Sequence, residues 1–432
     1  MYNPFNKNIS ELEYDDLKKL IDNDTSEGWF IEYKESFPKK NKKIANSIAS
    51  FANSEGGWYI VGIKENDRES KPSDIVGFDL ETNKKPTDKI TNIVKDNVDP
   101  IPYFESKVIE IPGNKVVLVV QVFEGHDTPY ISNGSVYIRV GETSKPLAIN
   151  DRYQFEKLLD KKQNFQRKVN SFMKNTFFFD RFYNQPYLEF YIYVNSSKGI
   201  LFEDFYSEEF FDNIKDNFNS NVELVQGSEI SASIIFDNAY ASVDSYILRH
   251  IYDNPQLQTG LTLEIFKEGH LKLIYPFNVH NKFSLNDKYE SLIDYDLFIS
   301  EDDNLRIIDL AESLLAFQTI LTQYKRLLEK YNFNQELNIK YKFKNFNSIT
   351  PFIDSEEFIK YIFENRLPIN LKTSIDIPNN DYIKYPFNKF NPLSFAFKLI
   401  EATGISRHLT KAIGEGYGKY ITIKSKNNEI KD

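Results

Sequence analysis

The sequence contains no cysteine, which excludes disulfide bonds and thiolate metal sites and agrees with a reducing cytoplasm. No run approaches the roughly 20 apolar residues that a membrane-spanning helix requires, and the first residues lack the apolar segment of a secretory signal. An overall basic character is also missing, because 63 Asp and Glu outnumber 53 Lys and Arg and the net charge is -10. These absences predict a cytoplasmic protein with no membrane segment, and they argue against nucleic-acid binding over its whole surface.

Apolar and aromatic side chains are plentiful. The 432 residues include 36 Phe and 27 Tyr, which is enough apolar surface for the cores of at least two domains. Strand and helix patterns interleave up to a basic stretch at residues 161–168, beyond which Asn, Phe and Tyr become more frequent. We therefore predict an α+β fold with a mixed sheet-and-helix domain over residues 1–163, followed by a separate α+β domain, in one or two parts, over residues 164–432.

Hydrophobic periodicity predicts the individual elements. In the first domain it indicates helices over residues 11–21, 41–52, 87–97 and 152–163, strands over residues 29–33, 58–63 and 135–140, a hairpin of residues 108–111 with 116–123, and a polar turn over residues 64–71. In the second domain it indicates strands over residues 187–194, 231–235, 261–266, 271–275 and 337–343, and helices over residues 305–331, 356–364 and 392–402. Ser10 and Glu13 have the spacing of a capping box for the first helix.

An acidic pair lies near the N-terminus. Glu27 and Glu32 are five residues apart, and Lys34 follows two residues after Glu32, so Glu32 and Lys34 share one face of the predicted strand. Converging carboxylates bind hard cations such as Mg²⁺ or Mn²⁺. Such an ion polarises a phosphoryl group and activates a water, and a lysine beside it stabilises the charge that develops.

A third acid is needed to complete such a site. The apolar strand over residues 58–63 follows a glycine turn, and Glu65 and Asp67 come directly after that strand. The sequence therefore predicts a metal site formed by Glu27, Glu32 and Glu65, with Asp67 as the alternative third acid. Acids beside a strand are more often solvated surface groups, and that is the competing interpretation.

A basic island accompanies the acids. Between residues 31 and 50 there are five lysines and two glutamates, which gives a local charge of five minus two, or +3. We interpret four of these lysines as phosphate-binding residues, against the alternative of a solvated helix start: Lys39, Lys40, Lys42 and Lys43.

Residues 27–34 resemble the acidic motif of the Schlafen-type AlbA-like domain, which is also called the divergent AAA domain. The resemblance continues in order through four more segments of this family, at residues 51–57, 61–63, 75–77 and 129–141. It covers about residues 10–160 and leaves the rest of the chain unassigned. Within these motifs we take Asn53 and Arg139 as further candidate contacts to nucleic acid.

The resemblance implies nucleic-acid binding and, in the Schlafen branch, metal-dependent cleavage of structured RNA, notably tRNA, by three acids. Two of these acids fall on Glu27 and Glu32. The third is normally an Asp in a Gly-Val-Asp-Asp stretch, where this chain has Gly62, Ile63, Lys64 and Glu65 instead. Glu65 can replace that Asp, whereas Lys64 cannot.

These observations lead to one main functional hypothesis and two alternatives. We expect a metal-dependent endoribonuclease whose C-terminal domain acts as a sensor, binds a protein partner or mediates oligomerisation, and the resemblance suggests a setting in antiphage defence. The alternatives are a non-catalytic, DNA-binding transcriptional regulator and an interaction module that has lost nucleic-acid function. No P-loop is present, because residues 414–419 lack Walker A spacing, so we expect no ATP machinery.

The resemblance also bears on assembly. Vertebrate Schlafen cores pair two related lobes of this domain, whereas this chain carries one clear copy. We therefore predict a homodimer that restores the second wall of the groove. The predicted helix at residues 305–331 and the aromatic run at residues 177–183 are the apolar surfaces that we assign to its interface.

Overall fold

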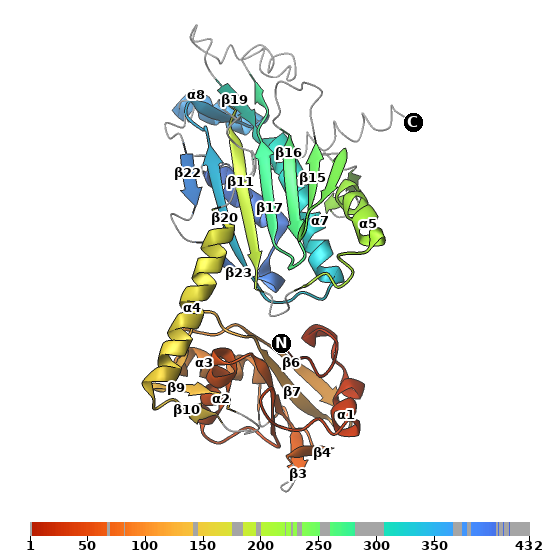
Figure 1. The fold of residues 1–432 in the computed structure, drawn as a ribbon, viewed down its shortest axis with the longest axis vertical. Helices are drawn as coiled ribbons and strands as arrows, with labels where there is room; N and C mark the ends of the chain where they lie inside the picture. Colours follow the sequence, from red (N-terminus) through yellow and green to blue (C-terminus); the bar gives the residue numbers. More distant parts are fainter. Residues whose placement is uncertain are drawn as a thin grey trace. The chain divides into compact units, whose positions relative to one another are not determined.

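A computed structural model divides the chain into two compact units, Met1–Phe172 and Met173–Asp432 (Figure 1). It describes residues 2–66, 70–81, 83–140, 146–174, 185–195, 200–220, 222–225, 228–230, 236–250, 260–280, 306–365, 374–377 and 382–402, together with residues 405, 409 and 414. Both units combine helices with sheets, so the predicted α+β class is confirmed.

The first unit is built around a four-stranded sheet in the order β1-β2-β7-β6. Its elements are η1 (Ile9–Glu11), α1 (Tyr14–Asp22), β1 (Ile31–Lys34), α2 (Asn41–Asn53), β2 (Gly57–Val61), β3 (Ile63–Asn66), β4 (Lys71–Ile75), α3 (Pro86–Asn97), β5 (Val98–Asp99), β6 (Phe104–Ile111), β7 (Lys115–Val122), β8 (Ile131–Ser132), β9 (Ser135–Ile138), β10 (Leu147–Ala148) and α4 (Arg152–Phe172). β1 and β2 run parallel with α2 as their crossover, and the other pairs in the sheet are antiparallel.

The sheet has a hydrophobic core on each face. Tyr59 and Val61 of β2 pack with α2 and α3, whereas Trp58 and Ile60 pack with α1 and the N-terminal segment. All five residues of β2 are buried, as the continuous apolar run of a central strand predicts. β1 is therefore fixed at the edge of a well-packed sheet, and its Glu32 and Lys34 lie on the α2 side.

Two glycines at the end of α2 have different roles. Gly56 adopts a φ of 79°, a left-handed conformation that favours glycine and turns the chain after the helix. Gly57 lies in β2, where an added Cβ would lie 2.3 Å from the ring of Phe51 and 2.7 Å from the carbonyl oxygen of Phe30. Gly57 is thus required for close packing rather than for its backbone angle.

Most predicted elements of the first unit are present, with three differences. The first helix begins at Tyr14, and its capping box is formed by Glu13 and Asp16 instead of Ser10 and Glu13. The polar stretch after β2 is a hairpin of β3 and β4, because Gly62 turns the chain at a φ of 111° and Ile63 is buried. α4 continues to Phe172, through the basic stretch at residues 161–168 where we expected the first domain to end, and the boundary between the units follows it.

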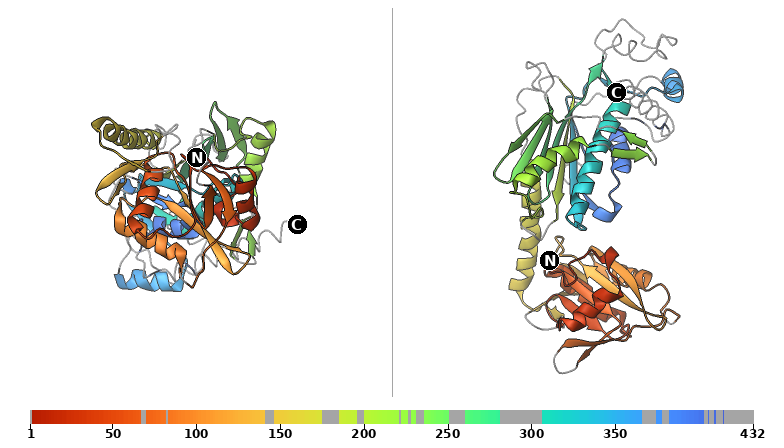
Figure 2. Two further views of the ribbon diagram at one scale, coloured as in Figure 1. Left: turned by 90° about the horizontal axis from the view of Figure 1, so that it is seen from below. Right: turned by 90° about the vertical axis from the view of Figure 1, so that its right-hand side faces the viewer.

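The second unit contains an eight-stranded antiparallel sheet. Seven strands follow the order β14-β15-β16-β17-β11-β20-β22, and β23 also pairs with β20. The elements of this unit are β11 (Tyr187–Val194), α5 (Glu208–Asn219), β12 (Val222–Val225), β13 (Ser228–Ile230), β14 (Asn238–Ala241), β15 (Ser245–His250), β16 (Leu261–Phe266), β17 (Leu271–Pro276), β18 (Val279–His280), β19 (Arg306–Asp309), α7 (Leu310–Lys330), β20 (Glu336–Lys344), β21 (Ile349–Phe352), α8 (Glu356–Asn365), β22 (Ser374–Ile377), β23 (Ile383–Pro386), η5 (Phe387–Lys389) and α9 (Pro392–Ala402). α5 and α7 cover one face of the large sheet (Figure 2, right).

The long helix of the second unit does not offer the apolar interface that we predicted. The segment begins as strand β19, and α7 starts only at Leu310. Its apolar stripe, which includes Leu314, Phe317 and Tyr324, is buried in the core of the unit. The predicted strand at residues 231–235, the aromatic run at residues 177–183 and most of the glycine-rich stretch at residues 414–419 lie outside the described residues.

No helix in the part of the chain that the structure describes has the length and apolar character needed to cross a membrane.

The close packing at Gly57 gives a direct test of the fold. Gly57→Ala should lower the free energy of unfolding by about 2–3 kcal/mol, because the new methyl group overlaps both a ring and a backbone carbonyl. Gly28→Ala is the matched control, since an added Cβ there meets nothing within 4 Å, and it should change stability by less than about 1 kcal/mol. Urea unfolding measures both, and equal stabilities of the two variants would contradict the packing.

Candidate active site

Glu27 lies in the loop before β1, and its side chain folds back over the strand. Its Oε1 atom accepts a hydrogen bond from the backbone N–H of Tyr33 at 2.9 Å. The backbone N–H of Glu27 donates to the carbonyl of Ser70, which leads into β4. The loop is therefore held from both sides, and Lys34 Nζ lies within 3.2 Å of both Glu27 and Glu32.

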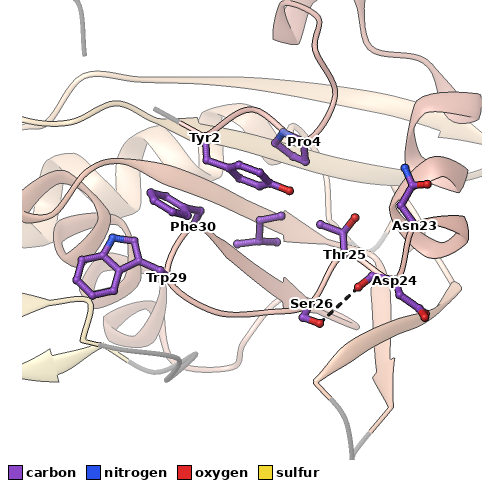
Figure 3. Close-up of a pocket in the computed structure, with 9 residues that line it drawn as sticks. Tyr2, Pro4, Asn23, Asp24, Thr25, Ser26, Trp29 and Phe30 are labelled. Atoms are coloured by element: carbon purple, nitrogen blue, oxygen red, sulfur yellow. Dashed lines mark hydrogen bonds between the residues drawn. The ribbon is translucent and has the colours of Figure 1, made fainter. Parts of the chain in front are cut away.

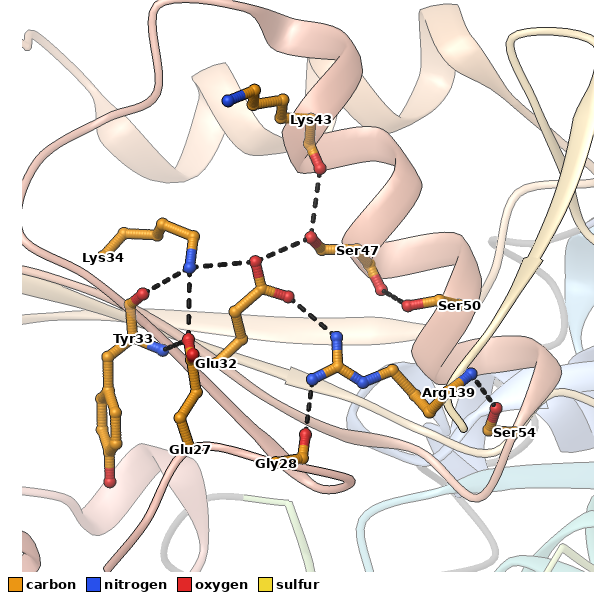
Figure 4. Close-up of polar contacts among 10 residues, drawn as sticks. All are labelled: Glu27, Gly28, Glu32, Tyr33, Lys34, Lys43, Ser47, Ser50, Ser54 and Arg139. Carbon is orange, nitrogen blue, oxygen red and sulfur yellow. Dashed lines mark hydrogen bonds and ion pairs between the residues drawn. The ribbon is translucent and has the colours of Figure 1, made fainter. Parts of the chain in front are cut away.

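Lys34 joins the two acids. Its Nζ atom lies 3.2 Å from Glu27 Oε1 and 3.1 Å from Glu32 Oε1, and it also donates to the carbonyl of Tyr33 (Figure 4). Although burial opposes its charge, the carboxylates of Glu32 and Glu27 raise the pKa of Lys34. The ammonium group thus occupies the position between the carboxylates where a bound cation would be expected.

Glu32 has a second cationic partner in Arg139, which follows β9. Arg139 Nη1 donates to Glu32 Oε2 at 3.0 Å, and both side chains are almost fully buried, at 0% and 5% exposed. Arg139 Nη2 donates to the carbonyl of Gly28, and the guanidinium lies 4.4 Å from the centre of the Phe51 ring. Ser47 of α2 completes the set, with its Oγ 3.0 Å from Glu32 Oε1.

Glu65 of β3 is the third acid at this site. Burial and the neighbouring Glu27 carboxylate raise the pKa of Glu65 to about 7. Three acids and one lysine thus meet where β1 and β3 lie together. Asp67, the alternative third acid, lies outside the described residues.

The donor types at this site suit a hard divalent cation. In the described part of the chain, however, no group of three or more Asp, Glu, His or Cys side chains is arranged to hold a metal ion. Lys34 pairs with both Glu27 and Glu32, and Arg139 pairs with Glu32 Oε2. A divalent ion would have to displace the ammonium of Lys34.

The hydroxyl of Tyr59 is a further polar group beside the acids. Tyr59 stands opposite Glu32 in the register of β1 and β2. Its hydroxyl is buried and has no hydrogen-bond partner in the described structure, and burial together with Glu32 and Glu27 raises its pKa. An unsatisfied hydroxyl is unfavourable in a protein interior, so this position fits a bound water or an ion with its hydration shell.

The four lysines of the basic island are all exposed around the first turn of α2. The carbonyl of Lys43 accepts from Ser47, whose hydroxyl also reaches Glu32, so the island begins one helical turn from the acids. The side chain of Lys43 points away from Glu32 (Figure 4). The lysines are free to meet a phosphate group, and they are separate from the ion pairs of the acidic cluster.

Asn53 and Arg139 occupy interior positions instead of a contact surface. The amide of Asn53 is buried, donates to the carbonyls of Tyr130 and Tyr137, and accepts from the N–H of Tyr130. The backbone N–H of Arg139 donates to Ser54 Oγ at 2.9 Å. Both residues therefore position the segment around β8 and β9, and neither presents a free polar group to a ligand.

Sequence reasoning missed Ser47, Tyr59 and the pairing of Arg139 with Glu32. Two signals could have found the first two residues. The helical period puts Ser47 on the buried side of α2, and the parallel pairing of β1 with β2 puts Tyr59 opposite Glu32. The Arg139–Glu32 pair joins residues 107 positions apart, and no local pattern signals it.

The comparisons with known proteins address this same unit. Residues 27–148 match the family model described as Schlafen, AlbA_2. The first unit therefore carries a Schlafen AlbA_2 domain, the resemblance expected from the sequence, and this family indicates nucleic-acid binding. The match ends at residue 148, and the second unit has no family match.

Two solved structures are similar to part of the chain. The DIP2311 protein from Corynebacterium diphtheriae is 19% identical over 33% of this chain and 28% of its own, with a TM-score of 0.22. The N-terminal domain of a RecG-related protein from Nitrosomonas europaea is 22% identical over 31% of this chain and 94% of its own, also with a TM-score of 0.22. This chain thus spans less than a third of the DIP2311 protein's length. A comparison with curated proteins finds no match.

The buried pair of Glu32 and Arg139 gives a test of the site. Arg139→Met should lower the free energy of unfolding by about 3 kcal/mol, because it leaves Glu32 buried with one cation fewer. Adding Glu32→Gln to that variant removes the stranded charge, so the double variant should lose at least about 1 kcal/mol less than the sum of the two single losses. A double-mutant cycle by urea unfolding measures this coupling, and additive losses would show that the two groups do not interact.

Proposed function

We propose that the first unit is a metal-dependent endoribonuclease that acts on structured RNA such as tRNA, in a setting of antiphage defence. The supporting observation is the convergence of Glu27, Glu32 and Glu65 with Lys34 in one partly buried cluster. Carboxylates gathered in this way repel one another unless cations lie among them. The family match supports the coarser statement, that this unit binds nucleic acid.

Glu27, Glu32 and Glu65 are the residues that would hold Mg²⁺ or Mn²⁺. The ion would polarise the scissile phosphate and lower the pKa of a water molecule. Arg139 and Ser47 fix the carboxylate of Glu32, so that this ligand needs little reorganisation. Lys34, whose side chain is 31% exposed, can turn outward and place its ammonium beside a phosphate oxygen.

Cleavage is tested with an acid whose loss leaves the Arg139–Glu32 pair intact. Glu65→Gln should reduce Mn²⁺-dependent cleavage of tRNA at least about 100-fold, since it removes a ligand charge from the site. Glu35→Gln is the matched control, because Glu35 is an exposed acid just after β1, and it should keep wild-type activity.

Circular dichroism confirms that each variant is folded, and Glu27→Gln serves as a second variant of the acidic cluster. Wild-type cleavage by folded Glu65→Gln and Glu27→Gln proteins would remove the assignment of this cluster as the catalytic centre.

The lysines around the start of α2 are proposed to bind the RNA backbone. The first turn of α2 contains no acid, so the positive end of the helix dipole adds to the charge of Lys40, Lys42 and Lys43. Lys39 extends this surface toward β1. A phosphate held here would lie one helical turn from Ser47 and Glu32.

Salt dependence measures this contribution. Each neutralised phosphate adds about 0.7–0.9 to the slope of log affinity against log salt. Replacing Lys39, Lys40, Lys42 and Lys43 by Ala should therefore flatten the slope by about 3, and replacing the exposed Lys84, Lys85 and Lys95 of the same unit should leave it nearly unchanged. An equal effect of the two sets would mean that the basic island makes no specific contact.

A second candidate is a non-catalytic, DNA-binding regulator. The observation that favours it is the ion pairing within the cluster, where Lys34 and Arg139 already neutralise the two most buried acids. This candidate would be selected over the nuclease if the folded wild-type protein binds DNA but cleaves neither RNA nor DNA in the presence of Mn²⁺.

We also propose that the protein is a homodimer, because one AlbA_2 domain provides a single wall of a groove. In the first unit, α4 exposes an apolar set that could form such an interface: Tyr153, Phe155 and Leu159. Light scattering at micromolar concentration should give twice the chain mass of 50.6 kDa, and Phe155→Asp should return the protein to a monomer. A wild-type monomer with and without RNA would rule the dimer out. If the protein is a monomer, the roles that we propose for the second unit are those of a sensor or a protein-binding domain.

A further inference from the structure

The loop that carries Glu27 also forms a pocket on its other side. This pocket has a volume of about 460 Å³ and is lined by residues of the N-terminal segment, the end of α1 and the loop before β1. Its lining residues are Tyr2, Pro4, Asn23, Asp24, Thr25, Ser26, Trp29, Phe30 and Ile31 (Figure 3). Its volume falls within the range of small-ligand sites in proteins, about 300–1,000 Å³.

One wall of the pocket is aromatic. The rings of Tyr2 and Phe30 lie 5.5 Å apart between centres and are inclined by 34°, and Trp29 adjoins Phe30 at 6.4 Å. Tyr2 is 45% exposed, but its carbonyl accepts a hydrogen bond from the indole of the buried Trp58. The aromatic wall is therefore accessible to a ligand and anchored to the core.

The opposite wall is polar and has unused hydrogen-bonding groups. The side chains of Asn23 and Thr25 make no hydrogen bond within the described structure, although the carbonyl of Thr25 is fixed by the hydroxyl of Tyr33. Asp24 pairs with Lys71 at 3.1 Å, and Ser26 reaches the Asp24 carbonyl at 3.4 Å (Figure 3). The polar part of the lining thus offers an amide, two hydroxyls and a carboxylate.

We propose that this pocket binds one nucleobase of a single-stranded segment of the nucleic acid. A base has a flat face that stacks on aromatic rings and an edge of donors and acceptors that amide, hydroxyl and carboxylate groups can pair with. The lining contains no Lys or Arg and includes Asp24, so a phosphate is disfavoured inside it. The base enters the pocket while its phosphates remain outside.

This inference rests on the proposed function and specifies how the substrate is recognised. Residues 24–26 directly precede Glu27, and both parts of the loop are tied to the β3–β4 hairpin. Asp24 pairs with Lys71 of β4, and the N–H of Glu27 bonds to the carbonyl of Ser70. β3 of the same hairpin carries Glu65. A base held in the pocket would therefore orient the strand relative to the acids.

Intrinsic fluorescence provides the assay, because the chain has two tryptophans and both adjoin this pocket. The full-length protein is titrated in EDTA, where no metal-dependent cleavage occurs, with the four nucleoside monophosphates and with a six-nucleotide single-stranded RNA. We expect a saturable change with the oligonucleotide at lower concentration than with the mononucleotides.

The variants assign that signal to the pocket. Tyr2→Leu and Asn23→Ala should each weaken oligonucleotide binding about tenfold, as expected from the loss of one stacking or hydrogen-bonding partner. Tyr240→Leu, at a Tyr of β14 in the second unit that is 47% exposed, should bind like the wild type.

Three outcomes would overturn the inference: no saturable change with any probe, unchanged affinity in both pocket variants, or mononucleotides that bind as tightly as the oligonucleotide, which would indicate a free-nucleotide site. Binding is measured without metal, so the oligonucleotide can bind in the pocket even if the protein cleaves no RNA. Equally, the protein can cleave RNA even if the pocket binds no base. The two proposals can therefore fail independently.

Discussion

The arrangement of the first unit depends on the burial of two carboxylates, those of Glu27 and Glu32. Unpaired charges in a protein interior cost several kcal/mol, so both acids need cationic partners that the fold must bring to them. Lys34 of β1 pairs with both acids. Arg139, which is 107 residues from Glu32 in the sequence, pairs with Glu32. The folded state is therefore compatible with these acids only if the segment around β9 is correctly placed.

Much of the motif around the end of α2 serves that placement. The amide of Asn53 holds the carbonyls of Tyr130 and Tyr137, Ser54 accepts the N–H of Arg139, and the Phe51 ring lies beneath its guanidinium. Gly57 leaves room for that ring. Asn53 and Arg139, which the sequence suggested as ligand contacts, therefore help to position Glu32, the acid that we propose to contact the ligand. The same loop that brings in Glu27 shapes the aromatic pocket on its other side.

The sequence predicted the local elements well and the long-range partners of the acids poorly. Strong periodicity located α2, and an unbroken apolar run located β2, because both signals arise from burial within one element. The β3–β4 hairpin was missed because its exposed face is polar. In addition, Gly62 turns the chain within a continuous apolar run, so the sequence does not show where β2 ends and β3 begins. The role of Arg139 was also missed, since a buried ion pair between distant segments leaves no local pattern.

The central proposal is that Glu27, Glu32 and Glu65 would together hold one divalent cation. Electron paramagnetic resonance of Mn²⁺ during titration of the full-length protein counts bound ions directly, without any nucleic acid. The account predicts one Mn²⁺ per chain in the wild type and a loss of at least about tenfold in affinity for Glu65→Gln and for Glu27→Gln. Absence of bound Mn²⁺ in the wild type, or the same affinity in all three proteins, would contradict it.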